Sequence, residues 1–261
     1  MYFNHLNILK PESINNLLKC ETIENGYKIP NIIHQTFATQ FLPLQIIQVI
    51  KRNKEICHNC KFIFYDDKQC EELLQNNFND EIFNAYKKIN PSYGAMRADF
   101  FRYCVLYLYG GIYLDIKSKI TYPLFKIITK EDICILDIPR TSLEKWRFNS
   151  PTYEQWLLIF APRHPYLLEI INQLVNNINK KYIPKEVNNY PLNKKGKILN
   201  ISGPDAFTKA INSYINNNNK ILHRSIDYNS FANLNPYIDY RAMYVINKKK
   251  HYSEVNEPIY L

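Results

Sequence analysis

The chain has 261 residues, of which 46% are hydrophobic and 14% aromatic, and this composition predicts a packed globular protein and excludes a disordered chain. A formal net charge of +9 suits an anionic partner, which leaves nucleic acid, a membrane surface and a phosphorylated small molecule open. The first residues, MYFNHLNILK, lack the basic start and apolar run of a signal peptide, and no stretch reaches the roughly 20 apolar residues of a membrane span. We therefore expect a soluble, cytoplasmic protein with no integral membrane segment.

The chain is too long, and its six cysteines too irregularly spaced, for the disulfide framework of a small secreted protein. Cys57 and Cys60 form one CxxC pair with Cys70 nearby, but the sequence has no second pair to complete a four-ligand zinc site. Free thiols in a reducing compartment are therefore favoured over zinc binding.

In chain order, the first predicted element is a helical addition over residues 1–27, which ends at Gly26. IPNIIHQTF then carries a short buried strand, a helix is predicted over residues 41–57, and KFIFYDD forms a second strand that ends in two aspartates. Helical patterning returns in DKQCEELLQNN and EIFNAYKKI. Because strands alternate with helices, we expect a single α/β domain over residues 1–261, built on a parallel or mixed sheet.

The segment PSYGAMRADFFRYCVLYLYGGIYLDIK predicts a helix, a stop at Gly110 and Gly111, and a strand. Asp99 and Arg102 lie three residues apart on the helix surface, where an exposed ion pair would contribute little to stability. The single apolar stripe of this helix is formed by Ala98, Phe101, Val105 and Leu108.

In the strand IYLDI, Tyr113 and Asp115 point to one side and the three aliphatic residues to the other. Open α/β sheets bind their ligands at the carboxyl ends of their strands. The carboxylate of Asp115 therefore predicts a ligand site at this point of the sheet.

Two later segments continue the α/β pattern. DICILDIPR predicts an apolar strand with Asp137 near its end, and a helix follows Pro165. KILNISGPDAFTKAINSYI predicts a strand, a turn at Gly203 and Pro204, and a helix that begins at Asp205. The carboxylate of Asp205 either caps that helix or marks a place where free N–H groups bind a phosphate or a sugar hydroxyl.

Five segments carry a more specific signal in this order: IPNIIHQTF, FYDD, RADFFRY, LYGGIYLD and ISGPDAFT. They resemble the DXD-type glycosyltransferases related to yeast α-1,6-mannosyltransferases and capsular polysaccharide glycosyltransferases (glycosyltransferase family 32-like), with clostridial glucosylating toxins as more distant relatives. The resemblance covers residues 29 to about 210. It implies a GT-A fold, with a Rossmann-like mixed sheet flanked by helices. It also implies an enzyme that moves a hexose-type sugar from a UDP- or GDP-sugar to a glycan or other hydroxyl acceptor, with retention of anomeric configuration.

The resemblance implies roles for single residues as well. Those that would act on the donor sugar and its diphosphate are Asp99, Arg102 and Asp115. Those that would bind the donor are His34, Gln35, Thr36, Phe37, Tyr113, Lys117, Asp205 and Ser253. The tail over residues 247–261 would close over the site, and a Mn²⁺ or Mg²⁺ ion would lie between Asp115, His251 and the phosphates. The tryptophan that follows this histidine and serine in the family is absent here.

Lys117 stands where the family has a second carboxylate, and a protonated lysine cannot bind a metal ion. Three interpretations remain open. Lys117 pairs with the diphosphate and partly replaces the metal, or it points away while Asp115, His251 and the phosphates hold the ion. In the third, transfer activity is lost and the chain is an inactive nucleotide-sugar-binding relative. A basic nucleic-acid-binding protein is a further alternative, but the lysines are scattered rather than interleaved with aromatic residues, so we expect no nucleic-acid partner.

Overall fold

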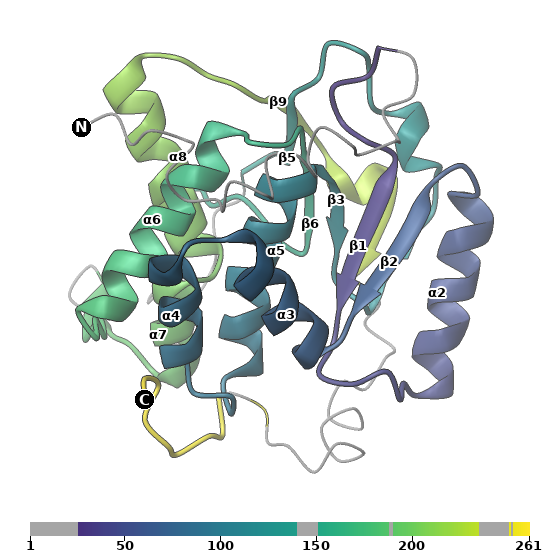
Figure 1. The fold of residues 1–261 in the computed structure, drawn as a ribbon. Helices are drawn as coiled ribbons and strands as arrows, with labels where there is room; N and C mark the ends of the chain where they lie inside the picture. Colours follow the sequence, from purple (N-terminus) through teal and green to yellow (C-terminus); the bar gives the residue numbers. More distant parts are fainter. Residues whose placement is uncertain (1–25, 140–150, 188–189, 235–250, 252) are drawn as a thin grey trace.

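The computed structural model describes residues 26–139, 151–187, 190–234, 251 and 253–261. The predicted helical addition lies outside the described residues except for its last two positions, as do residues 247–250 and 252 of the tail. The described chain folds around a six-stranded sheet with helices on both sides (Figure 1). Within this part of the chain, no helix combines the length and the apolar composition needed to cross a bilayer.

The sheet is mixed, which confirms the α/β fold class expected from the sequence. The order across it is β2 (Lys61–Tyr65), β1 (Ile32–Thr36), β3 (Gly111–Leu114), β6 (Leu157–Phe160), β5 (Cys134–Asp137) and β9 (Arg224–Ile226). β1 pairs in parallel with both β2 and β3, so the carboxyl ends of these three strands meet at one edge. β6 pairs antiparallel with β3 and β5, and β9 pairs in parallel with β5.

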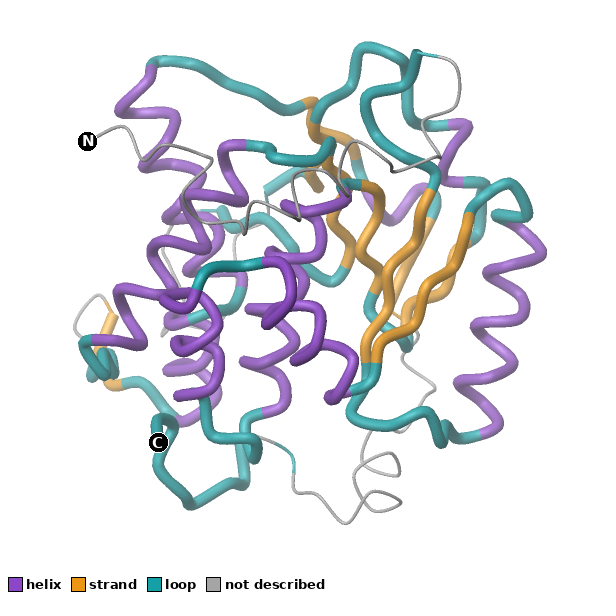
Figure 2. The backbone as a smooth tube through the Cα atoms, in the orientation of Figure 1, coloured by secondary structure: helices purple, strands orange, loops and turns teal. Residues whose placement is uncertain are grey.

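Most of the described helices pack on one face of the sheet (Figure 2). These are α3 (Asp67–Asn77), α4 (Asp80–Lys88), α5 (Gly94–Tyr109), α6 (Pro165–Asn179), α7 (Lys194–Ile201) and α8 (Pro204–Asn218). The other side carries α2 (Leu44–Ile56) and the short turns η2 (Leu124–Lys126) and η3 (Tyr228–Ser230). Two small ribbons pair β4 (Ser118–Ile120) with β10 (Ala232–Leu234) and β7 (Glu186–Val187) with β8 (Tyr190–Pro191).

The alternation of side chains along β3 separates two hydrophobic cores, as the sequence pattern predicted. Tyr113 packs in the core that contains helices α3 to α8, whereas Ile112 and Leu114 pack in the core on the other face. Asp115 directly follows β3 and contacts Arg102 of α5, so it lies on the same side as Tyr113. The strand therefore directs its terminal carboxylate towards the face that carries most of the helices.

Helix α5 is buried almost all round, although its sequence predicted a single apolar stripe. Twelve of its 16 residues are buried, because the helix lies between the sheet, through β1 and β3, and helix α6. Asp99 and Arg102, which the sequence allowed as an exposed ion pair, are consequently only 5% exposed each. Their positions are therefore determined by packing and by partners rather than by solvent.

The strand predicted in KILNI is wrong, because these residues belong to helix α7. The side chain of Asn193 accepts a hydrogen bond from the N–H of Gly196 at 2.8 Å and so caps the helix. Ile198 and Ile201 are three residues apart and both are buried. The local cap and the packing against α8 therefore outweigh the preference of β-branched residues for strands.

The turn between α5 and β3 requires glycine at two successive positions. Gly110 has a φ of 64° and Gly111 a φ of 92°, and both values lie in the left-handed region. A Cβ atom on Gly111 would lie 2.6 Å from the carbonyl oxygen of Ile32, because β1 passes directly beside it. The turn thus brings α5 and β3 together in a geometry that other residues do not allow.

We expect Gly111→Ala to lower the free energy of unfolding by roughly 2–4 kcal/mol, because it adds left-handed strain to a clash with the β1 backbone. Gly94→Ala is the matched control, since a Cβ atom there meets nothing within 4 Å. It should leave stability within about 1 kcal/mol of wild type, on the stabilising side. Urea unfolding measures both, and wild-type stability of Gly111→Ala would contradict this account of the turn.

Candidate active site

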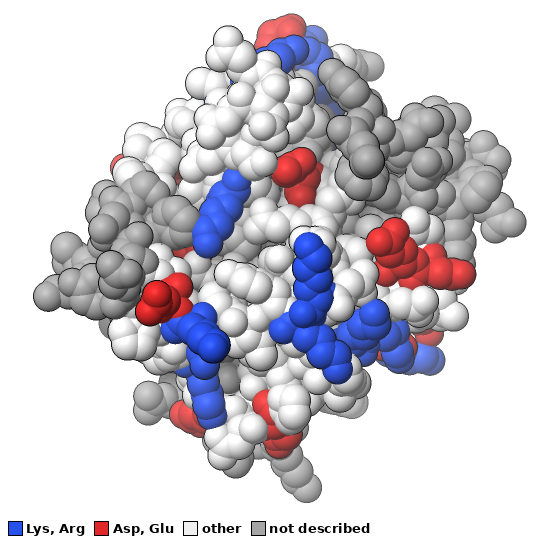
Figure 3. All heavy atoms as spheres, turned by 90° about the vertical axis from the view of Figure 1, so that its left-hand side faces the viewer, with Lys and Arg blue, Asp and Glu red and all other residues white. Residues whose placement is uncertain are grey.

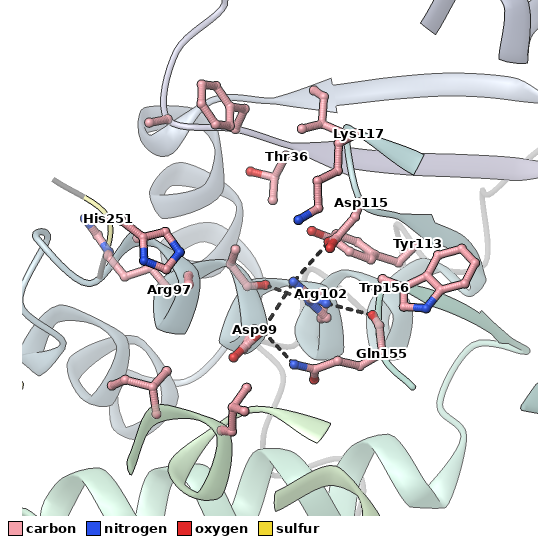
Figure 4. Close-up of a pocket in the computed structure, with 18 of the residues that line it drawn as sticks. Thr36, Arg97, Asp99, Arg102, Tyr113, Asp115, Lys117, Gln155, Trp156 and His251 are labelled. Carbon is pink, nitrogen blue, oxygen red and sulfur yellow. Dashed lines mark hydrogen bonds and ion pairs between the residues drawn. The ribbon is translucent and has the colours of Figure 1, made fainter. Parts of the chain in front are cut away.

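A pocket of about 650 Å³ opens at the carboxyl ends of β1 and β3. Its walls come from the residues after β1 and β3, the first half of α5, the segment before β6, and the C-terminal residues His251, Ser253 and Glu254. In Figure 4 the labelled side chains converge on the pocket from these separate elements. Its volume is in the range of pockets that bind small-molecule ligands and cofactors.

Small side chains on α5 leave the space that the pocket occupies. Gly94, Ala95 and Ala98 line it along the first two turns of the helix. Asp99 and Arg102 line it as well, because residues three and four apart share one side of a helix. The helix therefore presents open space and two charged groups to the same cavity.

Arg102 connects α5 to the end of β3. Its Nη2 atom lies 3.2 Å from Oδ1 of Asp99 and 3.2 Å from Oδ1 of Asp115. Its Nη1 atom donates a hydrogen bond of 2.7 Å to the carbonyl oxygen of Gln155, and its guanidinium lies 4.5 Å from the ring centroid of Tyr113. With these contacts made, Arg102 acts by holding the two carboxylates in place rather than as an open anion-binding group.

Asp99 is held by hydrogen bonds to both of its carboxylate oxygens. Oδ1 accepts from Nε2 of Gln155 at 3.0 Å, and Oδ2 accepts from Oγ of Ser202 at 2.7 Å. The hydroxyl of Tyr103 in turn donates to Gln155, which fixes that amide. Burial raises the pKa of Asp99 to about 7, although Arg102 and Ser202 favour its charged form. Asp99 is thus a buried positioning group that gains and loses a proton near neutral pH.

Asp115 is the carboxylate of this array that faces the cavity. Its side chain is 25% exposed, whereas those of Asp99 and Arg102 are each 7% exposed. The backbone N–H of Asp115 donates to the carbonyl oxygen of Trp156 at 2.8 Å, and the indole of Trp156 lines the pocket nearby (Figure 4). A carboxylate beside an indole suits a sugar ring, because hydroxyls donate to the carboxylate while the apolar ring face packs on the indole.

The four donor-binding residues expected at positions 34–37 divide into two pairs. Thr36 and Phe37 line the pocket, but His34 and Gln35 lie outside its lining. His34 is fully buried, with Nδ1 3.1 Å from the hydroxyl of Tyr65 and Nε2 3.0 Å from the carbonyl oxygen of Gly110. Burial lowers the pKa of His34 to about 4, although the Gly110 carbonyl favours the charged form. Its neutral ring therefore joins β1 to the glycine turn.

Asp205 also lies outside the pocket lining, in the first turn of α8. Its side chain is fully buried and accepts a hydrogen bond from Nδ2 of Asn200 at 3.0 Å. The predicted capping role is wrong, because the N-cap residue of α8 is Gly203, without a side-chain cap hydrogen bond. As a buried carboxylate in the first turn, Asp205 instead interacts favourably with the helix dipole. The neighbouring Pro204 does reach the pocket wall.

The C-terminal residues form one rim of the pocket, where His251 Nδ1 and Ser253 Oγ lie 2.6 Å apart. The segment behind them is attached by hydrogen bonds from three side chains. Lys194 Nζ donates to the carbonyl oxygen of Val255, Asn90 Nδ2 to that of Pro258 and Tyr93 Oη to that of Glu257, each at 2.8 Å. The described part of the tail therefore borders the pocket and is attached to the rest of the fold.

Lys117 points its amine into the pocket, next to the carboxylate of Asp115 (Figure 4). His251 lies on the other side of the pocket in the same view. Among the residues that the structure describes, no group of three His, Cys, Asp or Glu side chains could hold a metal ion. Mn²⁺ and Mg²⁺ take about six ligands, mostly oxygen atoms. The described residues around Asp115 therefore do not form a complete metal site by themselves, and an ion there would need oxygen ligands from the donor and from water.

Sequence reasoning missed several residues of the site, among them Arg97, Gln155, Trp156 and Ser202. Gln155 and Trp156 precede β6, and no local pattern marks this segment. Ser202 stands just before the predicted turn at Gly203, which was the available signal. Arg97 could not be recognised from its sequence neighbours, because its partner Glu71 lies on another helix, α3. Its Nη2 atom is 3.1 Å from Oε2 of Glu71.

Comparison with known proteins was made on both sequence and structure. The family model described as "Glycosyltransferase sugar-binding region containing DXD motif" matches residues 42–134, a stretch that includes Asp99, Arg102 and Asp115. A solved structure, the PaToxG glycosyltransferase, superimposes with a TM-score of 0.53 over 78% of both chains at 15% sequence identity, which indicates a shared fold.

Similar curated proteins include two initiation-specific alpha-1,6-mannosyltransferases. That of Schizosaccharomyces pombe is 31% identical over 169 residues, which cover 58% of this chain and 40% of the relative. That of Candida albicans is 28% identical over 169 residues, covering 58% of this chain and 43% of the relative. An uncharacterized glycosyltransferase of Acanthamoeba polyphaga mimivirus is 36% identical over 89 residues, or 33% of this chain and 35% of the relative. The chain thus spans less than half the length of these relatives.

The raised pKa of Asp99 makes stability depend on pH in a defined direction. Between about pH 4 and pH 7 the folded state keeps a proton that the unfolded state has released, so this residue's contribution to stability is lost as the pH rises towards 7. Asp99→Asn cannot titrate. The stability of this variant relative to wild type should therefore rise across that window, by on the order of 2–4 kcal/mol.

Asp132→Asn is the control, because its predicted change of stability with pH has the opposite sign. Burial disfavours the Asp132 carboxylate, but hydrogen bonds from Arg224 and Thr129 hold its pKa below the usual value. Asp132→Asn should be less stable than wild type at neutral pH. This difference should shrink as the pH falls through the lowered pKa that Asp132 has in the folded state. Chemical denaturation from pH 4 to pH 8 measures the change for Asp99→Asn, and its extension down to about pH 2 measures the change for Asp132→Asn. A flat difference for Asp99→Asn between pH 4 and pH 8 would show that Asp99 is ionised throughout.

Proposed function

We propose that this chain is a glycosyltransferase of the kind that contains a DXD sugar-binding region, and that it transfers a hexose-type sugar from a nucleotide-diphosphate donor to a hydroxyl group of a glycan or similar acceptor. The observation that carries the proposal is the ion array in the pocket. Arg102 joins Asp99 on α5 to Asp115 at the end of β3, and Asp115 alone of these three side chains is substantially exposed to the cavity. The family resemblance implied that all three residues act on the donor, and we propose this role for Asp115.

Each group of the array has a separate task in this proposal. The open oxygen of Asp115 accepts hydrogen bonds from hydroxyls of the donor, which orients the sugar. Arg102 holds that carboxylate in place, and Asp99 fixes Arg102 in turn. Thr36 and Phe37 border the nucleoside from the end of β1. Asp99 and Arg102 are therefore positioning residues, and Asp115 is the residue that contacts the donor.

For the chemical step we propose transfer with retention. The acceptor hydroxyl attacks the anomeric carbon on the face from which the diphosphate leaves, and a diphosphate oxygen takes the hydroxyl proton. Both oxygens of Asp99 are already hydrogen-bonded inside the protein, so this carboxylate is poorly placed to act as a nucleophile on the sugar. The names of the curated relatives favour mannose as the first donor sugar to test.

A reducing compartment such as the cytoplasm is supported by Cys57, Cys60, Cys70, Cys104 and Cys134, none of which forms a disulfide in the described part of the chain. The surface also weighs against the nucleic-acid alternative. On the helical face in Figure 3, basic side chains stand apart with acidic side chains among them, whereas a nucleic-acid groove requires a continuous basic track with aromatic platforms. We therefore give the transferase proposal precedence.

Asp115→Ala is expected to lower kcat by roughly 100-fold or more, because the donor sugar loses its orienting carboxylate. Glu131→Ala removes an exposed carboxylate of a surface ion pair and should leave turnover unchanged. The measurement is nucleotide release and sugar transfer over a panel of UDP- and GDP-sugars with mono- and oligosaccharide acceptors, with melting temperatures recorded for both variants. The proposal fails if Asp115→Ala keeps wild-type turnover, or if folded wild type turns over none of the donors.

The proposed retention of anomeric configuration is tested by the stereochemistry of the product. With an α-linked donor sugar, the first product observed by proton NMR should carry the α-configuration at the new bond. A product that is β-linked from the earliest time point would exclude same-face attack, while leaving the transferase assignment intact.

A further inference from the structure

The lysine beside Asp115 occupies the position at which DXD-type glycosyltransferases carry a second carboxylate. Those enzymes generally bind a divalent metal ion, which lies against the donor diphosphate. In this chain the amine of Lys117 points into the same pocket as the carboxylate of Asp115 (Figure 4). A diphosphate in this pocket would therefore meet a lysine where those enzymes have a carboxylate and a metal ion.

The oxygen ligands around Asp115 are too few for a protein-built cation site. One carboxylate oxygen of Asp115 already contacts Arg102 at 3.2 Å. His251 lies across the pocket, and its Nδ1 atom is 2.6 Å from the hydroxyl of Ser253. The described residues contain no cluster of three potential metal ligands. A divalent ion here would also meet the ammonium of Lys117, which repels it.

The charges of the site lead to the same conclusion. Arg102 contacts the carboxylates of both Asp99 and Asp115, and Lys117 points its amine into the same pocket beside Asp115. A carboxylate in place of Lys117 would change the site by two negative charges, which is the charge that one divalent cation cancels. The lysine thus supplies the electrostatic change that a metal ion brings to a DXD site. Arg102 cannot take over this role, because its guanidinium is committed to Asp99, Asp115 and Gln155.

We propose, on the basis of the function proposed above, that Lys117 replaces the divalent cation and that donor binding and transfer need no metal ion. In the transfer step the bond between the anomeric carbon and the diphosphate oxygen breaks, and its electron pair stays on that oxygen. The ammonium of Lys117 donates hydrogen bonds to the diphosphate and stabilises this charge. The acceptor oxygen forms the new bond to the anomeric carbon, and its proton passes to the diphosphate. No further reactant is required.

The test measures binding of UDP and of GDP by calorimetry, once in EDTA and once in Mn²⁺. Wild type should bind the preferred nucleotide with dissociation constants that agree within about threefold between the two conditions. Lys117→Met should weaken binding about tenfold or more in both, because the ammonium is lost and no metal ligand is gained. Lys117→Asp rebuilds the two-carboxylate pattern, so it should lose binding in EDTA and regain it in Mn²⁺.

Lys119→Asp is the matched control, because it makes the same change of charge two residues along the chain at a side chain outside the pocket lining. It should bind as wild type does in both conditions. Wild-type binding that disappears in EDTA and returns with Mn²⁺ would overturn the role of Lys117 and leave the transferase proposal standing. Wild-type binding in EDTA without turnover of any donor would support the role of Lys117 and overturn the transferase proposal. Absence of nucleotide binding in either condition would overturn both.

Discussion

A buried guanidinium determines the architecture of this site. Arg102 is 5% exposed, and a cation so far from water is stable only when carboxylates and hydrogen-bond acceptors surround it. Its partners come from its own helix, from the end of β3 and from the segment before β6. The glycine turn at Gly110 and Gly111 brings helix and strand close enough for one side chain to reach both. The floor of the pocket is therefore fixed before a ligand arrives, which lowers the cost of ordering it on binding.

The site has an inner part, which holds the charged side chains in position, and an outer part, which lines the pocket where a ligand would bind. Asp99 and Arg102 lie inside, where hydrogen bonds from Gln155 and Ser202 leave little room for movement. Asp115, Lys117, Trp156 and His251 line the open pocket, which the small residues of α5 make possible. In the proposed role of Lys117, the charge at this position determines how the site binds an anionic ligand. A carboxylate at residue 117 requires a metal ion between it and a phosphate, whereas a lysine contacts the phosphate directly.

Sequence reasoning succeeded where the signal was local. The period of two in IYLDI placed Tyr113 and Asp115 on one side of the sheet, and the double glycine ended the helix at the correct residue. It failed where partners are distant in sequence. Ser202 reaches Asp99 across 103 residues and Gln155 reaches it across 56, so no local pattern could show either contact. The burial of α5 on all sides and the helical state of KILNI likewise arise from tertiary packing and a cap.

The attachment of the C-terminal segment bears on how the molecule assembles. Asn90 and Tyr93 hydrogen-bond to carbonyl oxygens that lie 168 and 164 residues further along the chain. These bonds join the end of the chain to the loop that precedes α5, so the rim of the cavity depends on a contact between distant parts of the sequence. Without the docked segment, the ion array would keep its partners, but the cavity would lack one rim. A ligand that touches both parts therefore stabilises the docked state of the C-terminal segment.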